Sequence, residues 1–97
     1  IAWGYLMDAK PEEAEKIYDK LIEGNDATEA DLLNVGYTKW ILHKTKDAVG
    51  YLKSYAESLA AANRKILDDF MADKNVLELN GIKSYELKLM VDVLGVS

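Results

Sequence analysis

The feature that most constrains this chain is a match of the sequence to itself at a spacing of 34 residues. A pair of small residues twelve positions apart occurs twice, as Ala2 with Ala14 and as Gly36 with Ala48. Other pairs at this spacing are Ile1 with Val35, Trp3 with Tyr37, Leu6 with Trp40, Met7 with Ile41, Lys10 with Lys44 and Glu13 with Asp47. A self-match at this period is typical of stacked helical hairpins, in which each unit buries its apolar face against the next.

Apolar periodicity and turn residues divide the chain into helices and predict an all-α fold. The predicted helices span residues 1–7, 11–23, 28–43, 46–59, 63–72, 73–79 and 84–94. No strong breaker separates 46–59 from 63–72, so one continuous helix is an alternative there. The expected start and stop residues are Pro11, Thr28 with Asp31, Thr45 and Ser84 at helix starts, and Gly24 with Asn25, Asn80 with Gly81, and Gly95 at helix ends.

The apolar positions also predict a core. Residues 28–43 leave almost no polar face, so this helix is expected to be the most buried. The other stripes predicted to face inward are Ala48, Leu52, Tyr55, Ala56 and Leu59; Ile66, Leu67, Phe70 and Met71; and Leu87, Met90 and Leu94. We expect all three methionines to fill gaps in that core.

The repeat does not continue to the end of the chain. Moving Gly36 and Ala48 forward by 34 positions lands on Phe70 and Ile82, which are both large. We therefore expect a single domain over 1–97, with two repeats in 1–59, the first truncated. Residues 60–97 form either capping helices or a degenerate third repeat, and the sequence leaves both open.

Composition excludes several classes of protein. The formal net charge of -5 argues against a nucleic-acid module, which normally carries a basic face. No apolar run approaches the roughly 20 residues that span a bilayer, so we expect no membrane association. The chain has no Cys, which excludes disulfides and thiolate chemistry. It starts at Ile1 without Met, so we interpret it as a fragment or a processed product. The sequence does not decide the cellular compartment, although it slightly favours the cytoplasm.

No group of residues indicates catalysis, a cofactor or a metal, so we do not expect an enzyme. The single histidine, His43, has no partner constellation for acid–base or nucleophilic work. With Lys39, Lys44 and Lys46, it is expected to form a solvated basic group at one hairpin end. The remaining charged group, Asp68, Asp69 and Asp73, lacks the ligand spacing of a calcium loop and is expected to be a solvated helix face.

The repeated residues resemble the tetratricopeptide repeat, a helix-turn-helix unit of 34 residues. Its pattern is filled by Leu32, Val35, Gly36, Ala48 and Leu52 in the second copy, and by Ile1, Ala2, Tyr5, Ala14 and Tyr18 in the first. The small residues would let paired helices approach to roughly 8 to 10 Å. The chain departs from the pattern at Lys39, where a Tyr is expected, and at Asp26 and Ala60, where a closing Pro often stands.

This resemblance implies an α-α superhelix that serves as a protein-interaction scaffold. The first helix of each repeat would line a concave groove for a peptide or a partner helix. The residues carried over to that groove are Trp3, Leu6, Met7, Leu33, Tyr37, Trp40 and Ile41. Aromatic residues there would supply binding hot spots. Full burial of Tyr37 and Trp40 within the monomer would exclude the groove.

Two other functions remain open. The apolar helix at Ile1 could pack against a second copy, making the chain a homodimer or assembly element. A monomer at high concentration would count against this. The chain could also be an accessory domain of an enzyme or sensor whose active part lies upstream, which the full-length gene would show.

Overall fold

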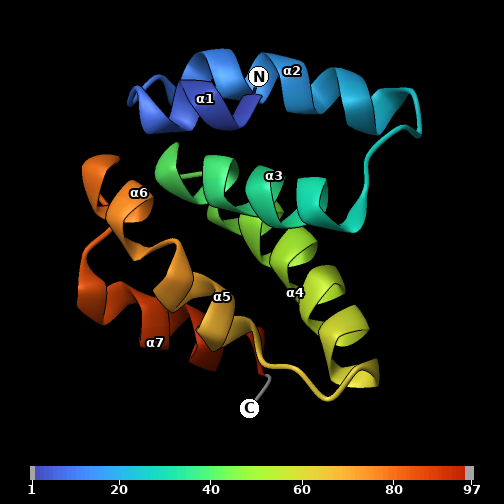
Figure 1. Cartoon of the computed structure of the whole chain (residues 1–97), viewed down its shortest axis with the longest axis vertical. Coiled ribbons are helices and arrows are strands. Elements are labelled where there is room, and N and C mark those ends of the chain that lie inside the picture. Colours follow the sequence, from blue (N-terminus) through green and yellow to red (C-terminus); the bar gives the residue numbers. More distant parts are fainter. Residues whose placement is uncertain (1, 96–97) are drawn as a thin grey trace.

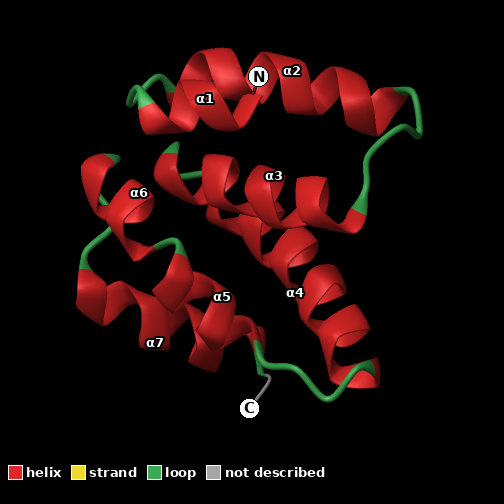
Figure 2. Cartoon of the chain, viewed as in Figure 1, coloured by secondary structure: helices red, strands yellow, loops and turns green. Residues whose placement is uncertain are grey.

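The computed structural model describes residues 2–95. The helices are α1 (Ala2–Met7), α2 (Pro11–Glu23), α3 (Glu29–Ile41), α4 (Thr45–Ala61), α5 (Ile66–Ala72), α6 (Lys74–Leu79) and α7 (Ser84–Leu94). Helices and their connecting turns account for the whole described range (Figure 2), which confirms the all-α prediction. Ile1, which the self-match pairs with Val35, lies outside this range.

The first four helices pack in chain order, and the last three pack back onto them (Figure 1). Contacts join α1 to α2, α2 to α3, and α3 to α4. The C-terminal helices α5 and α7 then contact α4, while α6 returns to α1. In Figure 1, α1 and α2 lie on one side of α3, and α5 and α7 lie on the other. Across residues 2–95, no helix combines the length and the apolar content needed to cross a membrane.

Local caps explain where several helices begin and end. The hydroxyl of Thr28 accepts from the N–H of Asp31 at 3.2 Å, and the carboxylate of Asp31 accepts from the N–H of Thr28 at 2.9 Å, so the predicted capping box is confirmed. The α7 helix ends at Gly95 in the left-handed conformation, with φ 71°, also as predicted. Thr45 and Ser84 are the first helical residues of α4 and α7, so their assignment as caps was wrong.

A sharp break separates α4 from α5, so a continuous helix is excluded. Residues 62–65 form the connection, and Asn63 lies in the left-handed region with φ 58°. After α2, Asn25 takes the left-handed conformation with φ 55°, whereas Gly24 does not. Asparagine adopts this conformation more readily than most residues, which makes it an effective stop.

The α3 helix is the most buried element, as predicted, with eight of its thirteen residues buried. Its close approach to α4 depends on Gly36. A Cβ atom placed on Gly36 would lie 2.4 Å from Cδ2 of Leu52, a fully buried side chain of α4. No side chain fits there without a shift of the core, which agrees with the small-residue position predicted from the repeat.

The inward stripes of α4 and α7 are confirmed, because their predicted members are all buried. In α5, Ile66 and Phe70 are buried and Leu67 is half-buried, but Met71 is 53% exposed. Met7 is also exposed, at 54%. The expectation that all three methionines fill the core was therefore correct only for Met90.

Candidate functional site

The residues predicted to line an open groove lie mainly inside the molecule. The buried members are Leu6, Leu33, Tyr37, Trp40 and Ile41, of which Tyr37 is 0% and Trp40 7% exposed. Trp3 is half-buried, and Met7 is exposed. Tyr37 is therefore out of a partner's reach, whereas Trp40, although mostly covered, still lines a surface pocket.

The chain's own C-terminal helices cover this face. The ring centroid of Phe70, on α5, lies 5.9 Å from that of Tyr37 and 5.5 Å from that of Trp40. On α1, the backbone carbonyl of Leu6 accepts from Nδ2 of Asn80 at 2.8 Å. Through Phe70 and Asn80, the C-terminal part of the described chain thus covers most of the face that a partner would occupy in the groove interpretation.

Hydrogen bonds from two tyrosines fix α5 in this position. Tyr37 donates to the Asp73 carboxylate at 2.7 Å, and Tyr55 donates to the Asp69 carboxylate at 2.9 Å. Arg64 adds an ion pair to Asp69 at 3.4 Å. The expectation of a solvated aspartate face was therefore wrong for Asp69 and Asp73, which help to hold the core together.

The pKa shifts in this network follow from burial and neighbouring carboxylates. Burial and the hydrogen bond to Asp69 raise the pKa of Tyr55 to about 12. The pKa of Tyr37 is also raised, first by burial and then by Asp73. Burial and the charge of Asp69 raise the pKa of Asp73 despite the bond from Tyr37. Each tyrosine is held as a neutral donor, which suits a structural role.

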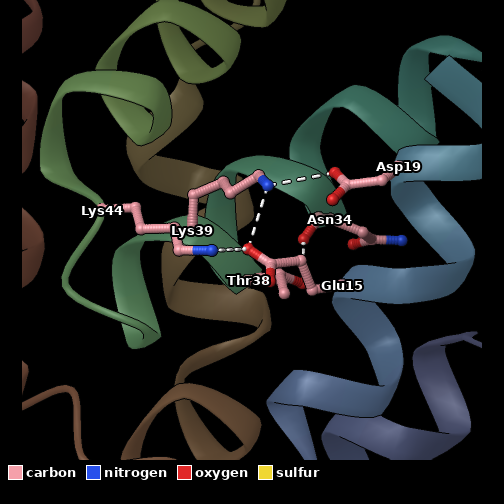
Figure 3. Close-up of polar contacts among 6 residues, drawn as sticks. All are labelled: Glu15, Asp19, Asn34, Thr38, Lys39 and Lys44. Atoms are coloured by element: carbon pink, nitrogen blue, oxygen red, sulfur yellow. Dashed lines mark hydrogen bonds and ion pairs between the residues drawn. The ribbon is translucent and has the colours of Figure 1, made fainter. Parts of the chain in front are cut away.

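A second polar cluster joins α2 to α3 (Figure 3). Lys39 is only 7% exposed, and its ammonium group binds Glu15 at 2.9 Å and Asp19 at 3.0 Å. Lys44 also binds Glu15, at 2.6 Å. The interpretation as a solvated basic group was therefore wrong for Lys39, whereas Lys44 is exposed as predicted and pairs with Glu15 from the surface. Since α2 is rich in acidic residues, its carboxylates neutralise this end of the α3–α4 hairpin.

The ion pairs in this cluster favour the charged forms of Glu15 and Lys39. Burial alone would raise the pKa of Glu15, but hydrogen bonds from Lys44 and Lys39 and their charges give a net lowering. Burial alone would lower the pKa of Lys39, but Glu15 and Asp19 give a net increase. Paired charges of this kind leave no free acid, base or nucleophile. Among the described residues, no group of His, Cys, Asp or Glu side chains could hold a metal ion.

The outer face of α7 is the exposed apolar surface that sequence reasoning missed. Tyr85, Leu89 and Val93 are 68%, 53% and 61% exposed and follow an i, i+4, i+8 spacing. Such residues share one face of a helix. The available signal was that α7 carries apolar residues on two faces, whereas the predicted core stripe used only one.

A small pocket of about 150 Å³ borders this surface. Its lining residues are Trp40, Glu86, Leu89, Met90 and Val93. The pocket is thus floored by the core residues Trp40 and Met90 and edged by the exposed Leu89 and Val93. A side chain of a partner could enter it and extend the apolar contact to the core. We define the α7 face as Tyr85, Leu89 and Val93 with this pocket.

Trp3 contributes to a different hollow. It lines a pocket of about 270 Å³ together with Tyr18 and Asn34, at the meeting of α1, α2 and α3. The accessible parts of the predicted groove set are this hollow, the exposed Met7 and the parts of Trp40 and Ile41 that line surface pockets. The ring centroid of Trp3 lies 6.4 Å from that of Tyr37, but Tyr37 is fully buried, so these residues do not form one open surface.

No family model, curated protein or solved structure matches the chain.

Proposed function

We propose that this chain is a protein-interaction module that docks a basic amphipathic segment of another protein on the α7 face. The observation that carries this proposal is the row of exposed apolar side chains at Tyr85, Leu89 and Val93. Scattered apolar residues are ordinary on a surface, but a contiguous row beside a pocket is a feature of interaction sites. An amphipathic helix binds such a surface through apolar side chains at its positions i, i+3, i+4 and i+7.

The structural role of the rest of the chain fits this function. The tetratricopeptide-like hairpins serve as a rigid support, because buried Gly36 and the Lys39 cluster hold α2, α3 and α4 together. The tyrosine network then fixes α5, against which α7 packs. A surface on such a support needs little reorganisation on binding, which reduces the entropic cost of association.

Charge favours a basic partner over a second copy. The chain carries a net charge of -5, so two copies repel each other, whereas a basic segment is attracted. Attraction of this kind raises the association rate and falls with salt. Within the docking surface, Glu86 lines the pocket and supplies a local negative charge.

A homodimer is the second candidate, and one observation favours it. Lys88 and Asp92 are both exposed and lie one turn apart beside the apolar row on α7. In an antiparallel two-fold pairing of α7 helices, Lys88 of one copy would face Asp92 of the other. The earlier dimer surface, the apolar start of the chain, is less suitable because Ala2 and Leu6 are buried against the chain itself.

The test is a selection from a display library of helical peptides, followed by affinity measurement with the whole chain. We expect the enriched peptides to combine apolar anchors with Lys or Arg. Their affinity should fall about 10- to 100-fold in Leu89→Asp, the loss expected for one buried leucine anchor. Leu79→Asp is the matched control, since Leu79 is 57% exposed but lies on α6.

Two results would overturn the proposal. One is an enriched set of peptides that binds equally well to the chain and to Leu89→Asp. The other is a failure of the selection combined with a dimer mass by light scattering, which would favour the homodimer instead. An accessory domain of a larger protein remains compatible with either form of docking.

A further inference from the structure

The hollow beside Trp3, here named the Trp3 hollow, lies on the α1–α2 side of α3, away from α7 (Figure 1). Its volume is about 270 Å³, and α1, α2 and α3 all contribute to its lining. The apolar lining residues are Ala2, Ile17 and Leu21, and the polar or aromatic ones are Trp3, Tyr18, Asp31 and Asn34. Apolar walls with a few polar side chains are the usual composition of a ligand site.

Two polar side chains of α3 are accessible in this hollow. Asp31 and Asn34 lie one helical turn apart, and both are half-buried. One oxygen of Asp31 accepts from the N–H of Thr28 at 2.9 Å, which leaves the other oxygen free. The amide of Asn34 extends toward α2, separate from the Lys39 cluster (Figure 3). Within residues 2–95, the unpaired side-chain atom that is fully covered is Oδ1 of Asn80, so the free oxygens of Asp31 and Asn34 are open to solvent.

Tyr18 forms the buried floor of the polar end, with 2% of its surface exposed. Burial and the charge of Asp31 raise the pKa of Tyr18 to about 12, although a hydrogen bond from Asn34 opposes the shift. The hydroxyl therefore stays neutral and lies beside both α3 side chains. Because an amide donates through its nitrogen, the bond to Tyr18 leaves the Asn34 oxygen as a free acceptor.

The charge around the hollow is negative. The described residues that line it include no lysine, arginine or histidine. Glu29 and Asp31, in the first turn of α3, offset the positive end of the helix dipole. Residues 8–31 hold nine carboxylates and three lysines, and Lys39 and Lys44 pair with only two of these carboxylates. A surplus of carboxylates raises the local concentration of cations.

An ammonium group on an aliphatic stem matches this lining. Such a group offers three donors and no acceptor, whereas Asp31 and Asn34 present free acceptors. The half-buried ring of Trp3 lines the same hollow, and the face of an indole attracts cations. Ile17 and Leu21 offer apolar surface for the methylene groups of the stem. A lysine side chain has both parts.

We infer that the Trp3 hollow binds a lysine side chain of a protein partner. The Asp31 carboxylate and the Asn34 amide oxygen accept from the ammonium group, and Trp3 contacts it through its ring. The stem packs along Ile17 and Leu21. This inference goes beyond docking on the α7 face and does not depend on it, because α3 lies between the two surfaces (Figure 1).

The test compares lysine and norleucine, each blocked by an acetyl group and an N-methylamide. Norleucine has the same aliphatic stem without the ammonium group. Each probe is titrated into the isotope-labelled whole chain at neutral pH and low salt, where charge attraction is least screened. We expect the indole N–H signal of Trp3 and the side-chain amide signals of Asn34 to move with the lysine probe only. The dissociation constant should be on the order of millimolar, as suits a probe with few non-hydrogen atoms.

Asp31→Asn should weaken the lysine probe about tenfold, the loss for a charged partner. The substitution keeps an oxygen for the Thr28 N–H, and circular dichroism checks that the variant folds. Glu29→Gln is the matched control, because it removes a carboxylate from the same turn of α3 outside the hollow. It should change the affinity by less than about twofold. Asn34→Ala leaves the helix cap intact and should weaken the probe about threefold.

Leu89→Asp should bind the lysine probe as the unchanged chain does, while it loses the selected peptides. Failure of docking on α7 and failure of this hollow are therefore distinguishable. A third probe, n-butylammonium, has the lysine stem without a peptide backbone and tests whether the ligand is a free amine.

Three results would overturn the inference. The first is an equal response to the norleucine probe, which would mean that the ammonium group is not recognised. The second is an unchanged affinity in folded Asp31→Asn or in Asn34→Ala. The third is a response to n-butylammonium without one to the lysine probe, which would identify a site for small amines that excludes a peptide.

Discussion

The hydroxyl of Tyr37 donates to the carboxylate of Asp73 at 2.7 Å and thereby joins the most buried helix to the junction of α5 and α6. The two residues are 36 positions apart in the chain. Because Tyr37 is fully buried, the bond forms where water competes little. This contact explains why the face predicted to bind a partner is instead closed by the chain's own C-terminal part.

Tyr37→Phe should lower the free energy of unfolding by about 1.5–3 kcal/mol, the usual range for a hydrogen bond to a charged group. The aromatic ring and its contact with Phe70 are kept, so the change isolates the hydroxyl. Urea unfolding followed by circular dichroism measures the effect. Tyr85→Phe is the control, since Tyr85 is exposed and should change stability by less than about 0.5 kcal/mol. Equal stability of the two variants would contradict the structural role of this bond.

Gly36→Ala should destabilise the chain by about 1–3 kcal/mol through overpacking. The added Cβ would meet Leu52, which is fully buried and has little room to move. Gly50→Ala provides the opposite case, because a Cβ at Gly50 meets nothing within 4 Å and the residue lies inside α4. Alanine there should stabilise by about 0.5–1 kcal/mol through helix propensity. Thermal unfolding of both variants would show opposite shifts, and shifts of the same sign would contradict the packing argument.

Local signals in the sequence were sufficient to predict most helices. Pro11, the Thr28–Asp31 capping box and Gly95 act within one turn of the backbone, so their positions alone set helix ends. The close packing of α3 and α4 at Gly36 could be predicted, because the repeat spacing requires a small residue at this position. The buried stripe of α4 was likewise visible in its apolar period.

The covering of the predicted groove face could not be inferred from the sequence, because it depends on contacts between distant parts of the chain. Apolar periodicity shows that Tyr37 and Trp40 are on an apolar face, but it does not show that Phe70 covers that face. Lys39 was misjudged for the same reason, since its partners Glu15 and Asp19 lie on another helix. The exposed apolar row on α7 could not be predicted either, because the sequence does not show which of the two apolar faces of this helix is buried.

Lys39→Met should leave stability nearly unchanged, within about 1 kcal/mol, because a buried ion pair often contributes no more than an apolar side chain of similar size. Glu15 keeps Lys44 as a partner, and Asp19 is partly exposed. Glu15→Ala should instead cost about 2–3 kcal/mol, since it leaves the buried Lys39 ammonium with Asp19 alone. Chemical unfolding of both variants measures the contrast. A large loss in Lys39→Met would show that the pair itself stabilises the fold.

The acid stability of the chain should depend on Glu15. Its pKa is lowered in the folded protein, chiefly because hydrogen bonds and charges from Lys44 and Lys39 outweigh burial. A carboxyl with a lowered folded pKa stabilises above its unfolded pKa, near 4.5, and loses that contribution as the pH falls through the lower folded value. Asp73 acts in the opposite sense, since its raised pKa means that protonation favours the fold.

The comparison of the chain with Glu15→Gln separates the two effects, because Asp73 is present in both proteins. At about pH 7 the variant should be less stable, and the difference should shrink toward zero as the pH falls below 4.5 and through the lowered pKa of folded Glu15. Urea unfolding at several pH values gives this difference directly. A difference that stays constant over the acid range would mean that Glu15 contributes through packing and not through its charge.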